Sequence, residues 1–83
     1  MQSYEQILAT LCKLLQAHAK EDLTVEGKTL LTSELGLDSA LLMEILLEIE
    51  DEFDVSIPLN TLPDIYDVKD MARMLEKLLN PSQ

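Results

Sequence analysis

The chain has 83 residues, and its 16 Asp and Glu against 6 Lys and Arg give a formal net charge of −10. This length predicts a single domain with a modest core, and the negative charge excludes nucleic-acid backbones and anionic membrane surfaces as partners. Hydrophobic residues make up 47% of the chain, which excludes a disordered acidic tail and predicts a folded protein whose partners carry basic patches.

Single residue types exclude several further classes. One Cys cannot form an internal disulfide, and one Cys with one His does not make a metal site. The sequence has no run of 18 apolar residues that would cross a membrane, and its first residues lack the basic region and cleavage site of a signal peptide. We therefore expect a soluble, cytoplasmic domain without a metal and without membrane insertion.

The first predicted helix runs from about Ser3 to about Ala19. Ser3 and Gln6 have the spacing of a capping box at its start. Apolar residues then recur at helical intervals: Ile7, Leu8, Leu11, Leu14 and Leu15. Residues 21–38 combine Asp, Thr, Ser and Gly, which interrupt regular structure, with several leucines. We expect a long connection there that packs its own apolar side chains.

The second helix is predicted from Ser39 to Phe53, with Asp38 as its N-cap, because no Gly or Pro interrupts this run. Pro58 lies beyond its end and pushes the preceding residue out of the helical conformation. Residues 59–65 are expected to form only a short helical turn because they contain Pro63.

The last predicted helix begins after Asp67, which has Asp70 three residues later, and ends at Asn80 and Pro81. Its apolar stripe consists of Val68, Met71, Ala72, Leu75, Leu78 and Leu79. The chain therefore predicts an all-α fold with three main helices, one short helical segment before the last helix, and a long loop after the first.

The second helix has two apolar stripes instead of one. On a helical wheel, the core stripe contains Leu42, Ile45, Leu46, Ile49 and Phe53. A small bundle rarely buries two opposite faces of one helix, so the second stripe is predicted to face water and to bind a partner. Between Lys28 and Lys69 there are ten Asp and Glu and no Lys or Arg, which favours a basic partner. The predicted partner-binding residues are Ala40, Met43, Glu44, Leu47, Glu50 and Asp51.

Ser39 lies at the first turn of this helix, after a turn that Gly36 permits. Free backbone N–H groups and the positive end of the helix dipole favour an attached phosphate at such a position. The alternative interpretation is that Ser39, or Asp38, only caps the helix.

Residues 34–44, which read ELGLDSALLME, resemble the attachment motif of the acyl carrier protein family, in which Asp-Ser precedes a docking helix with a Glu five residues after the Ser. Residues 49–58, IEDEFDVSIP, are similar to the family's acidic helix end and its Phe-x-x-x-Ile-Pro closure. The resemblance covers about residues 3 to 79.

The resemblance implies a four-helix bundle with a short third helix, forming one acyl carrier domain over residues 1–83. It implies that Ser39, flanked by Asp38, carries 4′-phosphopantetheine transferred from coenzyme A by a phosphopantetheinyl transferase. The terminal thiol of this arm would hold acyl groups as thioesters for enzymes of fatty acid, lipid or secondary-metabolite biosynthesis. The protein itself would be a phosphoprotein without catalytic residues. Apart from the resemblance, a monomer is the default expectation.

Two features separate the chain from the common pattern. Ala40 and Leu41 stand where family members commonly have Leu and often an acid, which favours a specialised carrier. Pro63 departs from the usual third helix. Two alternatives remain: an aminoacyl or peptidyl carrier with the same chemistry on Ser39, and an acidic helical adaptor that carries no cofactor. A hydrolase that uses Ser39 has no supporting residues.

Three other side chains have structural interpretations. Cys12 lies beside the core stripe of the first helix and is expected to be a half-buried thiol. His18 is expected near the C-terminus of that helix, where it complements the dipole. Glu48, with Glu44 and Asp51 on the same side, is expected to be a solvated carboxylate that binds a divalent cation only weakly.

Overall fold

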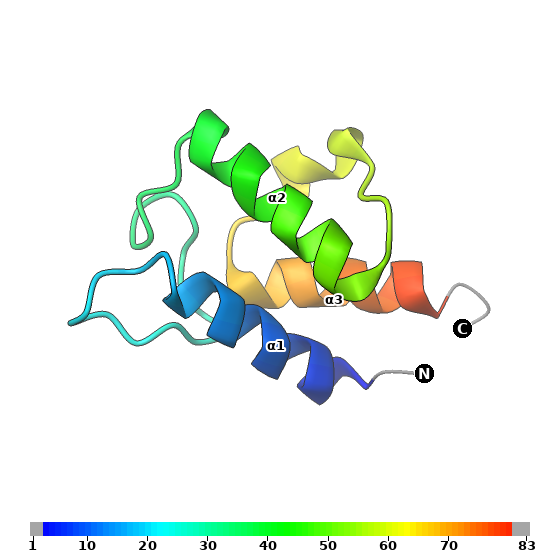
Figure 1. Ribbon diagram of the computed structural model, residues 1–83, viewed down its shortest axis with the longest axis horizontal. Helices are drawn as coiled ribbons and strands as arrows, with labels where there is room; N and C mark the ends of the chain where they lie inside the picture. Colours follow the sequence, from blue (N-terminus) through cyan, green and yellow to red (C-terminus); the bar gives the residue numbers. More distant parts are fainter. Residues whose placement is uncertain (1–2, 81–83) are drawn as a thin grey trace.

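Three α-helices and a short 3-10 helix follow one another as α1 (Tyr4–Gln16), α2 (Ser39–Phe53), η1 (Leu59–Asp64) and α3 (Val68–Leu79) (Figure 1). The computed structural model describes residues 3–80. In it, α1 packs mainly against α3, and α2 and η1 both lie on one side of this pair, above it in Figure 1. The expected all-α class is confirmed, and the short segment before the last helix is a 3-10 helix that contains Pro63.

The capping residues set the helix ends much as the sequence predicts. The Ser3 hydroxyl accepts from the N–H of Gln6 (3.2 Å), and Oε1 of Gln6 accepts from the N–H of Ser3 (3.0 Å), which completes the capping box. Asp67 and Asp70 form the corresponding box at the start of α3. The helix α2 has the predicted limits, with Asp38 as its N-cap.

The predicted end of the first helix, at Ala19, is wrong by three residues, because α1 ends at Gln16. The N–H groups of His18 and Ala19 bond three residues back instead of four, to Leu15 (2.9 Å) and Gln16 (3.2 Å). The side chain of Gln16 belongs to the loop: its Oε1 accepts from the N–H of Val25 (2.8 Å) and its Nε2 donates to the carbonyl of Leu23 (2.6 Å).

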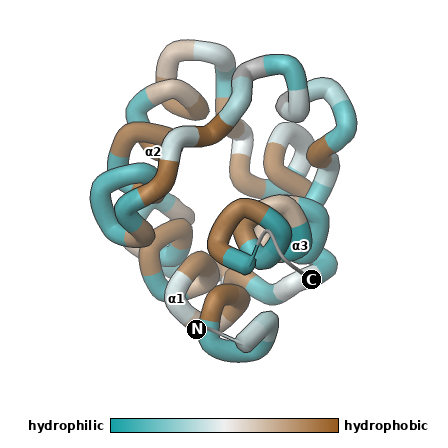
Figure 2. The backbone as a smooth tube through the Cα atoms, turned by 90° about the vertical axis from the view of Figure 1, so that its right-hand side faces the viewer, coloured by the Kyte–Doolittle hydropathy of each residue, from teal (hydrophilic) through white to brown (hydrophobic). Residues whose placement is uncertain are grey.

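The core contains side chains from all three α-helices and from the long loop. Figure 2 shows hydrophobic and hydrophilic residues alternating along each helix, as one buried face requires. The loops add Val25, Leu31, Leu37 and Ile57 to the buried set, so the long connection packs its own apolar residues as expected. The helices contribute Ile7, Leu11, Leu15, Ile45, Leu46, Ile49, Phe53, Val68, Met71, Ala72 and Leu75.

A short backbone contact attaches the long loop to the start of α3. Leu30 and Asp67 form an isolated antiparallel bridge. The N–H of Leu31 donates to the carbonyl of Tyr66 (3.0 Å), and the N–H of Val68 donates to the carbonyl of Thr29 (3.2 Å). This contact fixes the loop that leads into α2. Among the described residues, no helix has the length and apolar character that crossing a membrane requires.

Candidate functional site

Ser39 is the first residue of α2, and the loop before it is fixed by the contacts of Leu37 and by the backbone conformation of Gly36. Leu37 is buried, and its N–H donates to the carbonyl of Leu31 (3.1 Å). Gly36 adopts a positive φ of 67°, which an L side chain rarely adopts, and no atom would crowd a Cβ there. The backbone conformation, and not a lack of space, therefore requires this glycine and aims the chain into the helix.

Asp38 caps α2, and the Ser39 side chain takes no part in the cap. Oδ1 of Asp38 accepts from the N–H of Leu41 (2.8 Å), and its carbonyl accepts from the N–H of Leu42 (2.8 Å). Ser39 is exposed, and its hydroxyl makes no hydrogen bond to any residue that the structure describes. Of the two capping alternatives, the structure therefore assigns the cap to Asp38.

The surroundings of Ser39 fit a phosphodiester. Within residues 3–80, the backbone N–H groups of Ser39 and Ala40 have no acceptor, as is usual for the first turn of a helix. Both residues are exposed, so no side chain has to move to admit a bulky substituent on the hydroxyl. The positive end of the helix dipole favours the negative charge that a phosphodiester would bring.

The second apolar stripe of α2 faces water. Leu47 is 64% exposed and Met43 is 43% exposed, and Ala40 is exposed above them. We call these three residues the docking strip. The opposite face of the helix is in the core, where Ile45 and Ile49 are fully buried.

The carboxylates beside the docking strip differ in what they contact. Glu44 and Asp51 are exposed and make no hydrogen bond or ion pair with the described residues. Glu50 is half-buried, and its Oε2 accepts from the N–H of Ile57 (2.8 Å). Oε2 of Glu48 lies 2.8 Å from Nε2 of His18. The six predicted partner-binding residues thus lie along one helix, but Glu50 is held by the following loop.

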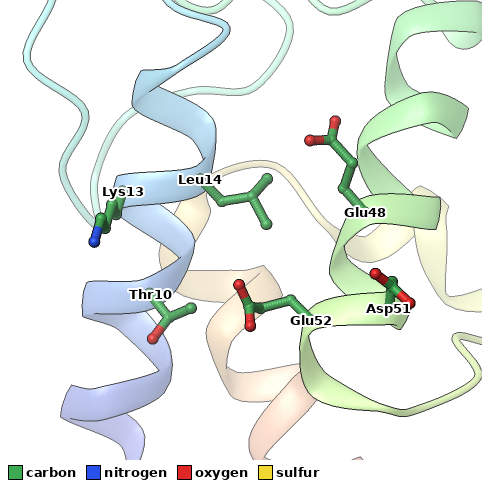
Figure 3. A pocket seen from close by; sticks show the side chains of 6 residues that line it. All are labelled: Thr10, Lys13, Leu14, Glu48, Asp51 and Glu52. Carbon is green, nitrogen blue, oxygen red and sulfur yellow. The ribbon is translucent and has the colours of Figure 1, made fainter.

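A groove of about 670 Å³ separates α1 from α2 beside these carboxylates. Figure 3 shows Thr10, Lys13 and Leu14 of α1 across from Glu48, Asp51 and Glu52 of α2. Ser39 does not line this groove, so the groove lies away from the candidate attachment site. No group of three or more His, Cys, Asp or Glu in the described part of the chain is arranged to hold a metal ion.

Cys12 is half-buried in α1, as expected. Burial raises the pKa of its thiol from the ordinary value of 9.0, and the negative charge of Glu26 raises it further. The thiol is therefore protonated near neutral pH and is a poor nucleophile.

Comparison with known proteins finds a matching family model and related proteins. A family model described as the phosphopantetheine attachment site matches residues 5–75. A probable acyl carrier protein of Caulobacter vibrioides (strain NA1000 / CB15N) is 35% identical over 54 residues, covering 65% of this chain and 63% of that protein. The chloroplastic acyl carrier protein 1 of Hordeum vulgare is 40% identical over 47 residues, covering 57% of this chain and 32% of that protein. The chain thus matches less than two thirds of the length of either relative.

Proposed function

The chain belongs to the phosphopantetheine-attachment family, whose covalent cofactor is 4′-phosphopantetheine, and we propose that Ser39 is the residue that carries this group. The resemblance to acyl carrier proteins is confirmed by the family match and by the named relatives. The observation that carries the proposal is the exposed Ser39 hydroxyl, free of capping duty, at the first turn of a helix inside the matched range.

We propose that the protein is an acyl carrier and catalyses no reaction itself. Attached at Ser39, the group would supply a thiol able to hold acyl chains as thioesters for partner enzymes. Asp38 keeps the first turn of α2 helical, and the N–H groups of Ser39 and Ala40 would stabilise the charge of a phosphodiester there. The single His of the chain contacts Glu48, so Ser39 has no imidazole base for turnover as a nucleophile.

We propose that partner enzymes bind the docking strip through apolar contacts and through Glu44 and Asp51. These two carboxylates are free, and a helical wheel places both on the α1 side of the strip. They are seven positions apart in the sequence, which is about 10 Å along the helix axis at 1.5 Å per residue. A matching partner has an apolar centre with two basic groups about that far apart. The phosphopantetheinyl transferase is the first such partner, because it must bind before any acyl group is loaded.

Two finer features belong to the same proposal. The first turn of α2 has no acidic residue after Asp38, because Ala40 and Leu41 are apolar, and this favours a specialised carrier in lipid or secondary-metabolite biosynthesis. The 3-10 helix η1 takes the place of the short third helix in a four-helix bundle, shortened because Pro63 lies within it.

A loading assay tests the proposal. The apo-protein is incubated with coenzyme A, Mg²⁺ and a broad-specificity phosphopantetheinyl transferase, and then with an acyl-loading or an aminoacyl-loading enzyme. We expect the wild type and Ser56→Ala, a control at another exposed serine, to accept the group and then an acyl chain, and Ser39→Ala to accept neither. Aminoacyl loading alone would favour the aminoacyl or peptidyl carrier. No modification by a transferase that is active on a control carrier would favour the adaptor.

A further inference from the structure

Glu50 is a junction between α2 and the segment that follows it. Its Oε2 accepts from the N–H of Ile57 at 2.8 Å. Its backbone carbonyl accepts from the N–H of Asp54, which caps the helix in the left-handed conformation (φ 54°), and from the N–H of Val55 at 3.2 Å. Glu50 therefore accepts hydrogen bonds from three N–H groups at and just beyond the C-terminal end of α2.

The contact with Ile57 leads directly to η1. Ile57 is buried, and the next residue, Pro58, has no N–H. The carbonyl of Pro58 accepts from both the N–H (3.1 Å) and the Oγ1 (2.7 Å) of Thr61, so this carbonyl opens η1. Oγ1 of Thr61 also lies 3.2 Å from Sδ of Met74 on α3. The carboxylate of Glu50 thus holds the residue before Pro58, where the approach to η1 begins. From there η1 reaches α3 through the contact of Thr61 with Met74.

The position of Glu50 separates it from the two free carboxylates. On a helical wheel it lies on the side of the docking strip away from Glu44 and Asp51. It is half-buried, whereas those two are exposed. If the Glu50 side chain rotated outward to contact a partner enzyme, the N–H of Ile57 would lose its acceptor. A partly buried N–H without an acceptor is costly in free energy.

We propose that Glu50 is a positioning residue: it fixes the segment that leads from α2 into η1 and is not one of the carboxylates that contact a partner. Figure 1 shows η1 on the same side of the α1–α3 pair as α2, which carries the docking strip. The proposal rests on the docking role given above to the strip, and it moves Glu50 out of the expected partner-binding set. The negative charges that meet a partner then lie on the α1 side of the strip.

Neutral replacement separates the two roles, because Gln keeps a side-chain oxygen that accepts from the N–H of Ile57 but has no charge. Two quantities are measured for Glu50→Gln, Glu50→Leu and the control Glu44→Gln. The first is the amide exchange rate of Ile57 and Thr61 in the apo-protein. The second is the set of kcat and KM values with which the transferase loads each variant.

We expect Glu50→Gln to keep both the slow exchange of Ile57 and the wild-type KM. We expect Glu50→Leu to speed the exchange of Ile57 by about 10-fold, with Thr61 following and the amides of α1 unchanged, and to raise KM more than it lowers kcat. Glu44→Gln should raise KM several-fold and leave the exchange of Ile57 as it is.

A KM for Glu50→Gln that rises as far as that of Glu44→Gln, with Ile57 still protected, would make Glu50 a docking carboxylate and overturn the proposal. Unchanged exchange of Ile57 in Glu50→Leu would overturn it as well. If Glu50→Leu does not fold, the comparison of Glu50→Gln with Glu44→Gln still decides. The exchange measurement needs no cofactor, so a failure of Ser39 to accept the group is seen separately.

Discussion

His18 and Glu48 join the turn after α1 to the middle of α2, with Nε2 of His18 2.8 Å from Oε2 of Glu48. Among residues 3–80 this is the one contact at salt-bridge distance, and it is an ion pair when His18 is protonated. Both side chains are partly exposed, so water and salt screen their attraction. Because α1 packs mainly against α3, this contact is a specific link across the α1–α2 groove.

The His18–Glu48 pair is expected to contribute little to stability. In a double-mutant cycle of His18→Gln and Glu48→Gln, we expect a coupling of about 0.2–1 kcal/mol in the free energy of unfolding. The measurement is urea denaturation at slightly acidic pH, in low and in high salt, and the coupling should shrink in high salt. A coupling of several kcal/mol, or one that salt does not change, would contradict this.

Removal of the α2 cap should weaken both the helix and the attachment site. Asp38→Ala takes away the acceptor of the N–H of Leu41 and should lower the free energy of unfolding by about 0.5–2 kcal/mol. Asp38→Asn keeps a capping oxygen and should lower the free energy of unfolding by only about a few tenths of a kcal/mol. Thermal unfolding followed by circular dichroism measures both. Equal losses in the two variants would mean that the charge, and not the capping hydrogen bond, is what matters.

Asp70 gives the protein a component of stability that is lost in acid. Its pKa is lowered from the ordinary value of 3.8, chiefly by the hydrogen bond from the N–H of Tyr66, with further help from Asp67 and Lys69 against partial desolvation. Because the folded-state pKa is the lower one, the carboxylate stabilises the folded state above pH 3.8 and loses this effect as the pH falls through the folded value. In urea denaturation, Asp70→Asn should be less stable than the wild type near neutral pH, and the difference should shrink below pH 3.8. A difference that stays constant into strong acid would refute this.

Salt should stabilise the whole protein. With a net charge of −10, counted with His18 neutral, and no Lys or Arg in a salt bridge in the part of the chain that the structure describes, repulsion among carboxylates opposes the compact state. Added NaCl, and more strongly Mg²⁺, should therefore raise Tm in differential scanning calorimetry. Choline chloride at equal ionic strength is a control for screening without a divalent ion. A Tm that does not rise in any salt would show that local contacts already balance the acids.

Local signals in the sequence predict most of the fold. The capping residues Ser3, Asp38 and Asp67 each accept from the N–H three residues further on, so short patterns identify them. The two stripes of α2 follow from helical spacing alone, because a small core covers only one of them. Ser39 stands out through its motif and its place at the first turn.

The contacts that the sequence does not reveal join residues that are far apart or lie beyond a helix end. Glu48 and His18 are separated by 30 residues, and no local pattern brings them together. Gln16 looks like a helix residue, but its amide binds the loop at Leu23 and Val25 and helps to end α1 early. Glu50 reads as one more acid beside the strip, and only the path of the following loop turns it toward Ile57.

The position of the modification decides whether Ser39 carries the phosphopantetheine group. The apo-protein is loaded by a broad-specificity transferase with coenzyme A and Mg²⁺, its intact mass is measured, and the modified residue is located by peptide mapping. We expect a gain of one phosphopantetheine group, on Ser39 and on no other serine. A group found on another residue, or no gain on a folded protein with a transferase that is active on a control carrier, would refute the assignment of Ser39.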